Sequence, residues 1–127
     1  MSKIYQATNA INLADLPKMV KKNPHYTKMF AGLAQIDNHV KKFIEDIVCN
    51  QTDGSVYYIK TELSGHCYNL YLYNIETRST VGVSWPLAEF LERCENKSLE
   101  LELNLKVSSM LQKFDTKLEP NKVHWIN

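Results

Sequence analysis

The residues in this sequence best suited to catalysis or metal binding are four histidines and three cysteines, and their spacing predicts neither function. No histidine is followed three or four residues later by a second ligand, the spacing that places two metal ligands on one face of a helix. His66 and Cys67 are adjacent, but neighbouring side chains of a strand point to opposite faces and cannot easily share a proton. A catalytic Cys67 would therefore need His124 from elsewhere in the chain. We expect no metal, no cofactor and no enzymatic activity.

Carboxylates and glycines add no catalytic signal. Glu45 and Asp46 fall on the polar face of a predicted helix. Glu100 and Glu102 occupy alternate positions of a predicted strand, so both pairs are expected to be solvated. No glycine-rich loop follows a predicted strand, so we find no phosphate-binding loop.

Charge and cysteine usage exclude several classes of function. Fifteen basic residues against fourteen acidic ones give a net charge of +1, without the basic excess that holds a protein to nucleic acid. Three widely spaced cysteines, Cys49, Cys67 and Cys94, favour free thiols in a reducing compartment. The first residues lack the apolar run of a signal peptide, and no window is long enough to span a membrane. We expect a cytoplasmic protein that binds neither nucleic acid nor membranes.

The distribution of tyrosine is the most informative feature for function. Five of the seven tyrosines lie between residues 57 and 73. A tyrosine is apolar along its ring and polar at its hydroxyl, which suits surfaces that a partner or a ligand covers. Tyr71 and Tyr73 fall on one face of a predicted strand and Tyr68 on the other. Because one helix layer covers only one face of a sheet, we expect the other face to be exposed and partly aromatic.

We therefore predict a surface on this hairpin that binds a protein partner. Its residues are Tyr57, Tyr58, Tyr68, Tyr71 and Tyr73, with Lys60 and Arg78 at the rim. An RNA-binding sheet would also place aromatic residues beside basic ones, and the tyrosines could instead be core or edge residues. The partner hypothesis depends most on whichever of Tyr68 and Tyr71 proves exposed.

The element expected to cover the sheet is a long amphipathic helix of about 25 residues. Asn23 followed by Pro24 is a strong helix start, because asparagine caps a helix and proline suits its first turn. Apolar residues then recur every three or four positions, at Met29, Leu33, Ile36, Val40, Phe43 and Ile47. The polar face carries Lys28, Gln35, Lys41, Lys42, Glu45 and Asp46. His39 lies beside the apolar stripe as a helix-surface residue, and a short helix is predicted at 15–22.

After a turn at 50–55 the apolar period changes to two, which predicts strands. We expect strands at 56–63, 66–75 and 80–85, arranged as an antiparallel meander.

The last third of the chain is predicted to contain helices and a fourth strand. Trp85 and Pro86 begin a helix, and leucines alternate with polar residues over 99–107, a period that favours a strand. A final helix ends before Pro120, followed by a short apolar tail at 123–126. The predicted fold is α+β with the order α-α-β-β-β-α-β-α. It forms a single domain over 1–127, in which 1–12 is a loose lead-in.

In general build this chain resembles the small immunity proteins with which bacteria neutralise toxins of contact-dependent competition. The features that fit are the expected absence of a signal peptide, the expected absence of catalytic residues and the tyrosine-rich sheet. That resemblance implies a non-enzymatic protein that binds a cognate toxin stoichiometrically. Such inhibitors are often acidic when the toxin is a nuclease, whereas this chain is nearly neutral. Two alternatives are a ligand-binding domain with a pocket lined by Tyr71, Tyr73 and Trp85, and a secretion-type chaperone, whose order of strands and helices is similar.

Overall fold

The structure is a computed structural model that describes residues 3–6, 33–52 and 55–126. Within these ranges three helices pack on one five-stranded sheet, so the predicted α+β class is confirmed. The strands are β1 (Lys3–Gln6), β2 (Val56–Ser64), β3 (Cys67–Asn74), β4 (Ser79–Pro86) and β5 (Val123–Ile126). The helices are α3 (Leu33–Gln51), α4 (Leu87–Glu95) and α5 (Leu99–Phe114). The predicted helix at 15–22 and the predicted helix start at Asn23 lie outside the described residues.

The sheet has the spatial order β1-β2-β3-β4-β5 and is mixed. The central strands β2, β3 and β4 pair antiparallel, and Gly65 turns the first hairpin at a φ of 61°, a backbone conformation that favours glycine. At the two edges β1 runs parallel to β2, and β5 runs parallel to β4. The predicted antiparallel meander is therefore confirmed for the centre of the sheet alone. Residues 3–6 and 123–126, expected as a lead-in and a tail, form the edge strands.

α3 confirms the part of the predicted long helix that the structure describes. Of the predicted apolar stripe, Leu33, Val40 and Ile47 are buried, whereas Ile36 and Phe43 are half-buried against the core. Ile44 and Val48, which lie beside that stripe on the helix, complete the buried face. One residue of the predicted polar face differs from the expectation. Lys41 is buried, because its ammonium group pairs across one helical turn with the equally buried Asp37 at 3.1 Å.

The predicted strand at 99–107 is wrong, because this segment forms the first part of α5. Leucine and glutamate are both strong helix formers, and a second apolar pattern with helical period runs through the same residues. The residues on that pattern are buried: Leu99, Leu103, Val107, Met110 and Leu111. The alternate leucines that suggested a strand, Leu101 and Leu105, are 67% and 59% exposed. The predicted final helix continues α5 and ends at Phe114, before Pro120.

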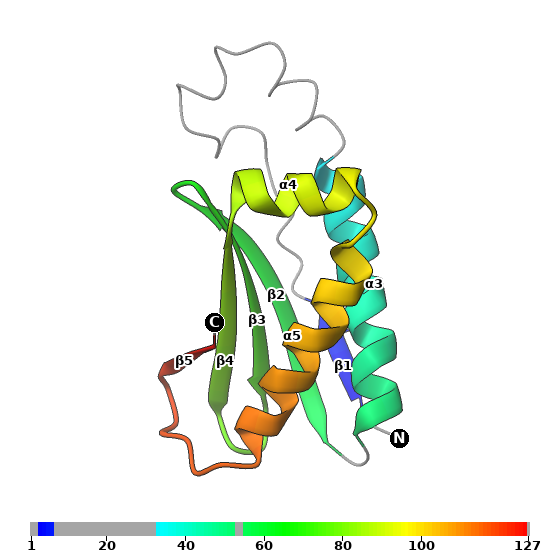
Figure 1. The fold of residues 1–127 in the computed structure, drawn as a ribbon. Coiled ribbons are helices and arrows are strands. Elements are labelled where there is room, and N and C mark those ends of the chain that lie inside the picture. Colours follow the sequence, from blue (N-terminus) through cyan, green and yellow to red (C-terminus); the bar gives the residue numbers. More distant parts are fainter. Residues whose placement is uncertain (1–2, 7–32, 53–54, 127) are drawn as a thin grey trace.

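All three helices lie on one face of the sheet, with α3 and α5 side by side and α4 across one end (Figure 1). The core between the layers is continuous and joins the buried stripes of the helices to one face of β2, β3 and β4. None of the described helices is both long and apolar enough to cross a membrane.

Candidate functional site: the tyrosine face of the sheet

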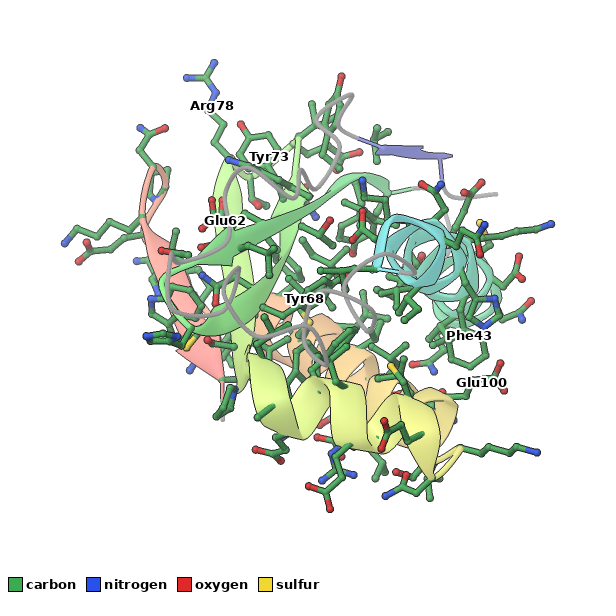
Figure 2. The ribbon with its side chains drawn as sticks, turned by 90° about the horizontal axis from the view of Figure 1, so that it is seen from above. Phe43, Glu62, Tyr68, Tyr73, Arg78 and Glu100 are labelled. Atoms are coloured by element: carbon green, nitrogen blue, oxygen red, sulfur yellow. The ribbon has the colours of Figure 1, made fainter. Side chains whose placement is uncertain are left out.

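The alternation of side chains along β2 and β3 divides the predicted tyrosine cluster between the two faces of the sheet. Tyr57 and Tyr68 point toward the helices and are buried, Tyr68 completely so. Figure 2 shows Tyr68 on the helix side, whereas Tyr73 lies on the other side of the sheet. Tyr57 and Tyr68 were predicted as partner-binding residues, and the structure places both in the buried core rather than on a surface.

The remaining tyrosines form a partly exposed surface with their cross-strand neighbours. Tyr58 lies opposite Tyr73, and Lys60 lies opposite Tyr71. Glu62, the next residue of β2 on this face, lies opposite Asn69. We call this surface the tyrosine face. It contains a groove of about 480 Å³ lined by Tyr58, Lys60, Glu62, Tyr71, Tyr73, Thr80 and Val123.

Trp125 is a residue of this surface that the sequence reasoning missed. It lies opposite Gly82 of β4, which in turn lies opposite Tyr71. Its indole packs edge-on against the Tyr71 ring, with centroids 5.5 Å apart, and remains 51% exposed. A Cβ atom at Gly82 would lie 3.1 Å from both aromatic rings, so glycine lets them approach over the sheet. The sequence analysis identified residues 123–126 as an apolar tail, which includes Trp125. Their pattern did not show that the tail forms a strand of the sheet.

Glu62 is a hydrogen-bond acceptor on the tyrosine face, in the row next to Lys60 and Tyr71. Its Oε1 atom accepts a hydrogen bond from the Tyr71 hydroxyl at 2.5 Å and another from Asn69 Nδ2 at 3.3 Å. Burial and the hydrogen bond to this carboxylate raise the pKa of Tyr71 to about 12. Tyr71 therefore stays a neutral hydrogen-bond donor at physiological pH.

Of the two predicted rim residues, Lys60 lies on the tyrosine face and Arg78 lies beyond its end. Lys60 Nζ is 4.0 Å from Glu62 Oε2 and 6.0 Å from the centroid of the Tyr71 ring. Arg78 occupies the turn between β3 and β4 at a φ of 59°, and its carbonyl accepts a hydrogen bond from the backbone of Asn121. Figure 2 shows the Arg78 side chain projecting away from the body of the molecule.

The other face of the same strands carries a buried polar cluster. Asp37 Oδ1 accepts hydrogen bonds from the hydroxyls of Thr61 and Tyr68, each at 2.6 Å, while Oδ2 pairs with Lys41. Burial, followed by the charge of Asp37, raises the pKa of Tyr68 well above its usual value. With all four residues in the core, this cluster organises the interior and offers no surface to a ligand.

Trp85, expected to line a ligand pocket with Tyr71 and Tyr73, lies on the opposite face of the sheet from them. It is buried against Tyr68 and Phe90, with ring centroids 6.3 and 5.9 Å away. Its indole N–H donates to Glu102 at 3.2 Å, which places Glu102 in a partly buried polar cluster rather than on a solvated strand face. The predicted aromatic pocket of these three residues is therefore not formed.

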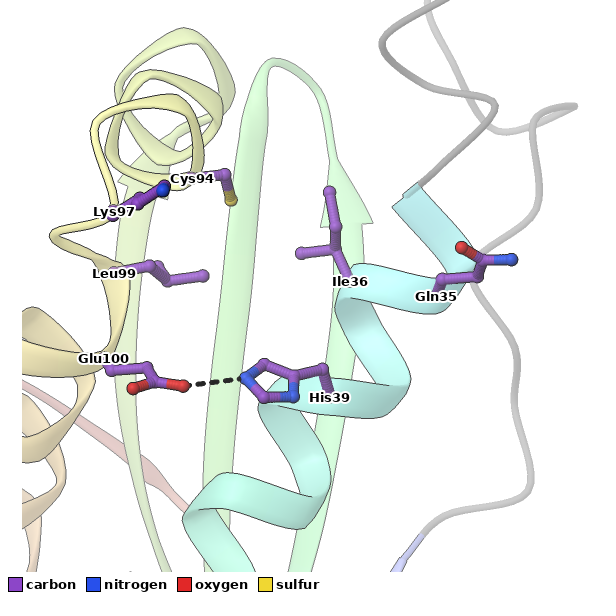
Figure 3. Close-up of a pocket in the computed structure, with 7 residues that line it drawn as sticks. All are labelled: Gln35, Ile36, His39, Cys94, Lys97, Leu99 and Glu100. Atoms are coloured by element: carbon purple, nitrogen blue, oxygen red, sulfur yellow. Dashed lines mark hydrogen bonds and ion pairs between the residues drawn. The ribbon is translucent and has the colours of Figure 1, made fainter.

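A second hollow, of about 520 Å³, lies between α3 and the start of α5 (Figure 3). His39 Nε2 and Glu100 Oε1 meet across it at 3.0 Å, and both side chains are more than half exposed, as expected for a helix-surface histidine. Such an exposed pair contributes little to stability. Cys94 also lines the hollow, and burial, followed by the nearby charge of Glu95, raises its pKa, so its thiol is a poor nucleophile at neutral pH.

The pairing of Cys67 with His124 that a thiol enzyme would need is not formed. Cys67 lies opposite Pro86, whereas His124 lies opposite Val81, five positions along β4. At the usual rise of a strand this offset is about 16 Å. His124 instead approaches the carbonyl of Glu119 at 3.0 Å.

In the described part of the chain, no three histidine, cysteine or acidic side chains are grouped so that they could hold a metal ion. The tyrosine face contains aromatic and hydrogen-bonding side chains. Comparisons of this chain with protein-family models, curated proteins and solved structures found no match.

Proposed function

We propose that this chain is a non-enzymatic protein-binding domain that contacts its partner through the tyrosine face. The observation that supports this most strongly is the group of partly exposed aromatic side chains on the sheet face opposite the helices: Tyr58, Tyr71, Tyr73 and Trp125. Tyrosine and tryptophan are enriched at protein interfaces, where a few such anchors supply most of the binding energy. A folded domain gains little from aromatic rings that solvent still reaches.

The partner that we propose is a toxin domain, which this chain would neutralise by binding in the bacterial cytoplasm. The support for this narrower proposal is a resemblance in build: a small α+β domain whose notable surface is aromatic rather than catalytic. A stoichiometric inhibitor needs one surface of high complementarity and no reactive group. The tyrosine face is suited to that role.

The small-molecule alternative is less well supported by the geometry. Ligand pockets bury most of the ligand surface and are largely enclosed. The groove on the tyrosine face lies on the outer side of the sheet, and Trp85, which was to close such a pocket, is in the core. The chaperone alternative depended on a strand at 99–107, which is helical.

Affinity capture followed by measured binding tests the proposal. The intact chain is used to isolate a stoichiometric partner from the source cells, and the purified partner is then titrated with variants by calorimetry. We expect Tyr71→Ala to weaken binding by about 2 kcal/mol or more, as for an interface anchor. The matched control is Leu101→Ala, an equally simple truncation of an exposed side chain on α5, which should leave the affinity within about 0.5 kcal/mol of the parent.

The outcome that would remove the proposal is a partner that binds Tyr71→Ala and Trp125→Ala as tightly as it binds the parent. Both variants are first checked by thermal unfolding, because an affinity lost through misfolding says nothing about the surface. For the toxin proposal, the captured partner should also arrest growth when it is expressed alone. Growth should be restored by the parent chain and not by Tyr71→Ala.

A further inference from the structure

We propose that the groove on the tyrosine face binds a guanidinium group, supplied by an arginine side chain of the protein partner. This inference rests on the proposed function and specifies the chemistry of the segment that the partner inserts. Three features of the groove carry it: a carboxylate oxygen with spare capacity, aromatic rings beside that carboxylate, and an unsatisfied acceptor next to it.

The first feature is the unequal use of the two oxygens of Glu62. Oε1 accepts hydrogen bonds from Tyr71 and Asn69, which fix the carboxylate in place. Oε2 is 4.0 Å from Lys60 Nζ, which is beyond hydrogen-bonding distance. An ionised carboxylate has about four lone-pair sites, so Oε2 can still accept strong bonds from a charged donor. The groove lining therefore contains an oriented anion.

The second feature is the aromatic surface around this anion. The Tyr71 ring, fixed by its hydroxyl at Glu62 and by the Trp125 indole, lines the groove together with Tyr58 and Tyr73. A cation held over the face of such a ring is attracted by the ring quadrupole. A guanidinium group is planar and weakly hydrated, so it stacks on aromatic faces better than an ammonium group does.

The third feature is Asn69, a buried residue whose Oδ1 atom has no hydrogen-bond partner in the described structure. An unsatisfied buried acceptor is costly, and native structures contain few of them. Because Nδ2 of the same amide donates to Glu62, Oδ1 lies close to the carboxylate. A guanidinium has five N–H donors in a fixed plane, enough to serve Glu62 and, after a small adjustment, Asn69 as well.

Lys60 shows that the groove already attracts a cation from its own chain. Its ammonium group lies near both Glu62 and the Tyr71 ring, at distances that are the outer limits of an ion pair and of a cation–π contact. Its side chain is 52% exposed, so this contact is loose. An incoming arginine would compete with Lys60, and removal of Lys60 should strengthen arginine binding.

The two tryptophans report binding of an arginine probe to the groove. Trp125 lies beside the groove, and Trp85, which lies in the core, serves as the internal control. The probes are N-acetyl-arginine methylamide and the matched neutral N-acetyl-citrulline methylamide, added to the intact chain while the two indole N–H signals are followed by NMR. We expect a saturable shift of the Trp125 signal with the arginine probe, with a dissociation constant of about 1 mM. Citrulline should cause no saturable shift, and the Trp85 signal should not move with either probe.

Variants locate the binding group. Glu62→Gln should weaken the arginine probe about tenfold or more, because it removes the charge that accepts the guanidinium. Lys60→Met should strengthen it about threefold, because it removes the competing cation. Unfolding midpoints near that of the parent confirm that both variants are folded. Equal shifts with arginine and citrulline, or an unchanged affinity in Glu62→Gln, would overturn the inference.

The two proposals fail in different ways. If Tyr71→Ala loses the partner but the Trp125 signal does not distinguish arginine from citrulline, the tyrosine face is an interface and the guanidinium inference is wrong. If the arginine probe binds through Glu62 but the partner tolerates Tyr71→Ala, the proposed function is wrong, and the inference loses the protein partner on which it rests.

Discussion

Strand β3 has a tyrosine on each face of the sheet that donates a hydrogen bond to a carboxylate of another element. The two tyrosine–carboxylate pairs differ in how completely the protein encloses them. Toward the helices, the Tyr68 hydroxyl donates to Asp37 at 2.6 Å. On the other face, the Tyr71 hydroxyl donates to Glu62 at 2.5 Å. Each carboxylate also has a lysine nearby, Lys41 at 3.1 Å from Asp37 and Lys60 at 4.0 Å from Glu62.

Because of this difference, the inner pair serves the stability of the fold and the outer pair is a candidate for binding. The inner carboxylate has donors on both oxygens and is buried with its lysine, so the whole arrangement is fixed by the fold. The outer carboxylate keeps one oxygen outside hydrogen-bonding distance of its lysine, and solvent reaches both side chains. The same types of residue therefore act as a structural cluster on one face and as a candidate recognition site on the other.

The largest expected effect is at Asp37. Asp37→Asn removes the carboxylate that pairs with buried Lys41 and should lower the free energy of unfolding by about 3–5 kcal/mol, as expected when one member of a buried ion pair is lost. Glu62→Gln makes the same chemical change on the exposed face and should cost less than about 1 kcal/mol. Chemical denaturation of both variants gives the comparison. Equal losses would show that the two faces do not differ in the way described.

A smaller effect is expected when each hydroxyl is removed. Tyr68→Phe deletes a buried hydrogen bond to a charged acceptor and should cost about 1.5–3 kcal/mol. Tyr71→Phe should cost less than about 1 kcal/mol, because water can reach Glu62 in its place. Urea unfolding of the two variants measures the difference. A larger loss for Tyr71→Phe would mean that the outer pair, rather than the inner one, supports the fold.

The smallest effect concerns the titration of Tyr71. Its pKa is raised from 10.0 to about 12, first by burial and then by Glu62. Glu62→Gln should therefore lower the Tyr71 pKa only part of the way, since burial remains. Because the folded pKa is the higher one, the stabilisation linked to Tyr71 is complete below pH 10 and is lost as the pH rises toward 12. Tyrosine ring carbon signals followed by NMR against pH would detect this, and an unchanged Tyr71 pKa in the variant would exclude Glu62 as a cause.

The sequence allowed prediction of the elements whose apolar period is unambiguous. The apolar pattern of α3 indicates a helix, and those of β2, β3 and β4 indicate strands; the three strands form as expected, and so does the described part of the helix. Residues 99–107 fit both periods at once, because an apolar residue occupies every second position while the buried residues Leu99, Leu103 and Val107 repeat every four. Only the packing decides between the two periods, and packing against α3 and β4 selects the helix.

Only part of the candidate site could be predicted from the sequence, because its other residues are brought together by contacts between distant segments. Alternation placed Tyr71 and Tyr73 on the face opposite Tyr68, but it could not say which face the helices cover. Trp125 was missed because it joins the site through a parallel pairing with β4, a contact between segments about forty residues apart that local patterns do not encode. The roles of Asp37 and Glu62 depend on partners from other elements in the same way.

Hydroxyl-radical footprinting of the chain, free and bound to its captured partner, tests most directly the claim that the tyrosine face is the binding surface. Trp125 and Tyr58 are exposed in the free chain, as is Leu101 on α5. Binding should strongly reduce oxidation of Trp125 and Tyr58 and leave that of Leu101 unchanged. Unchanged oxidation of Trp125 and Tyr58, with protection at Leu101 and Leu105 instead, would place the partner on the helix layer and contradict the account.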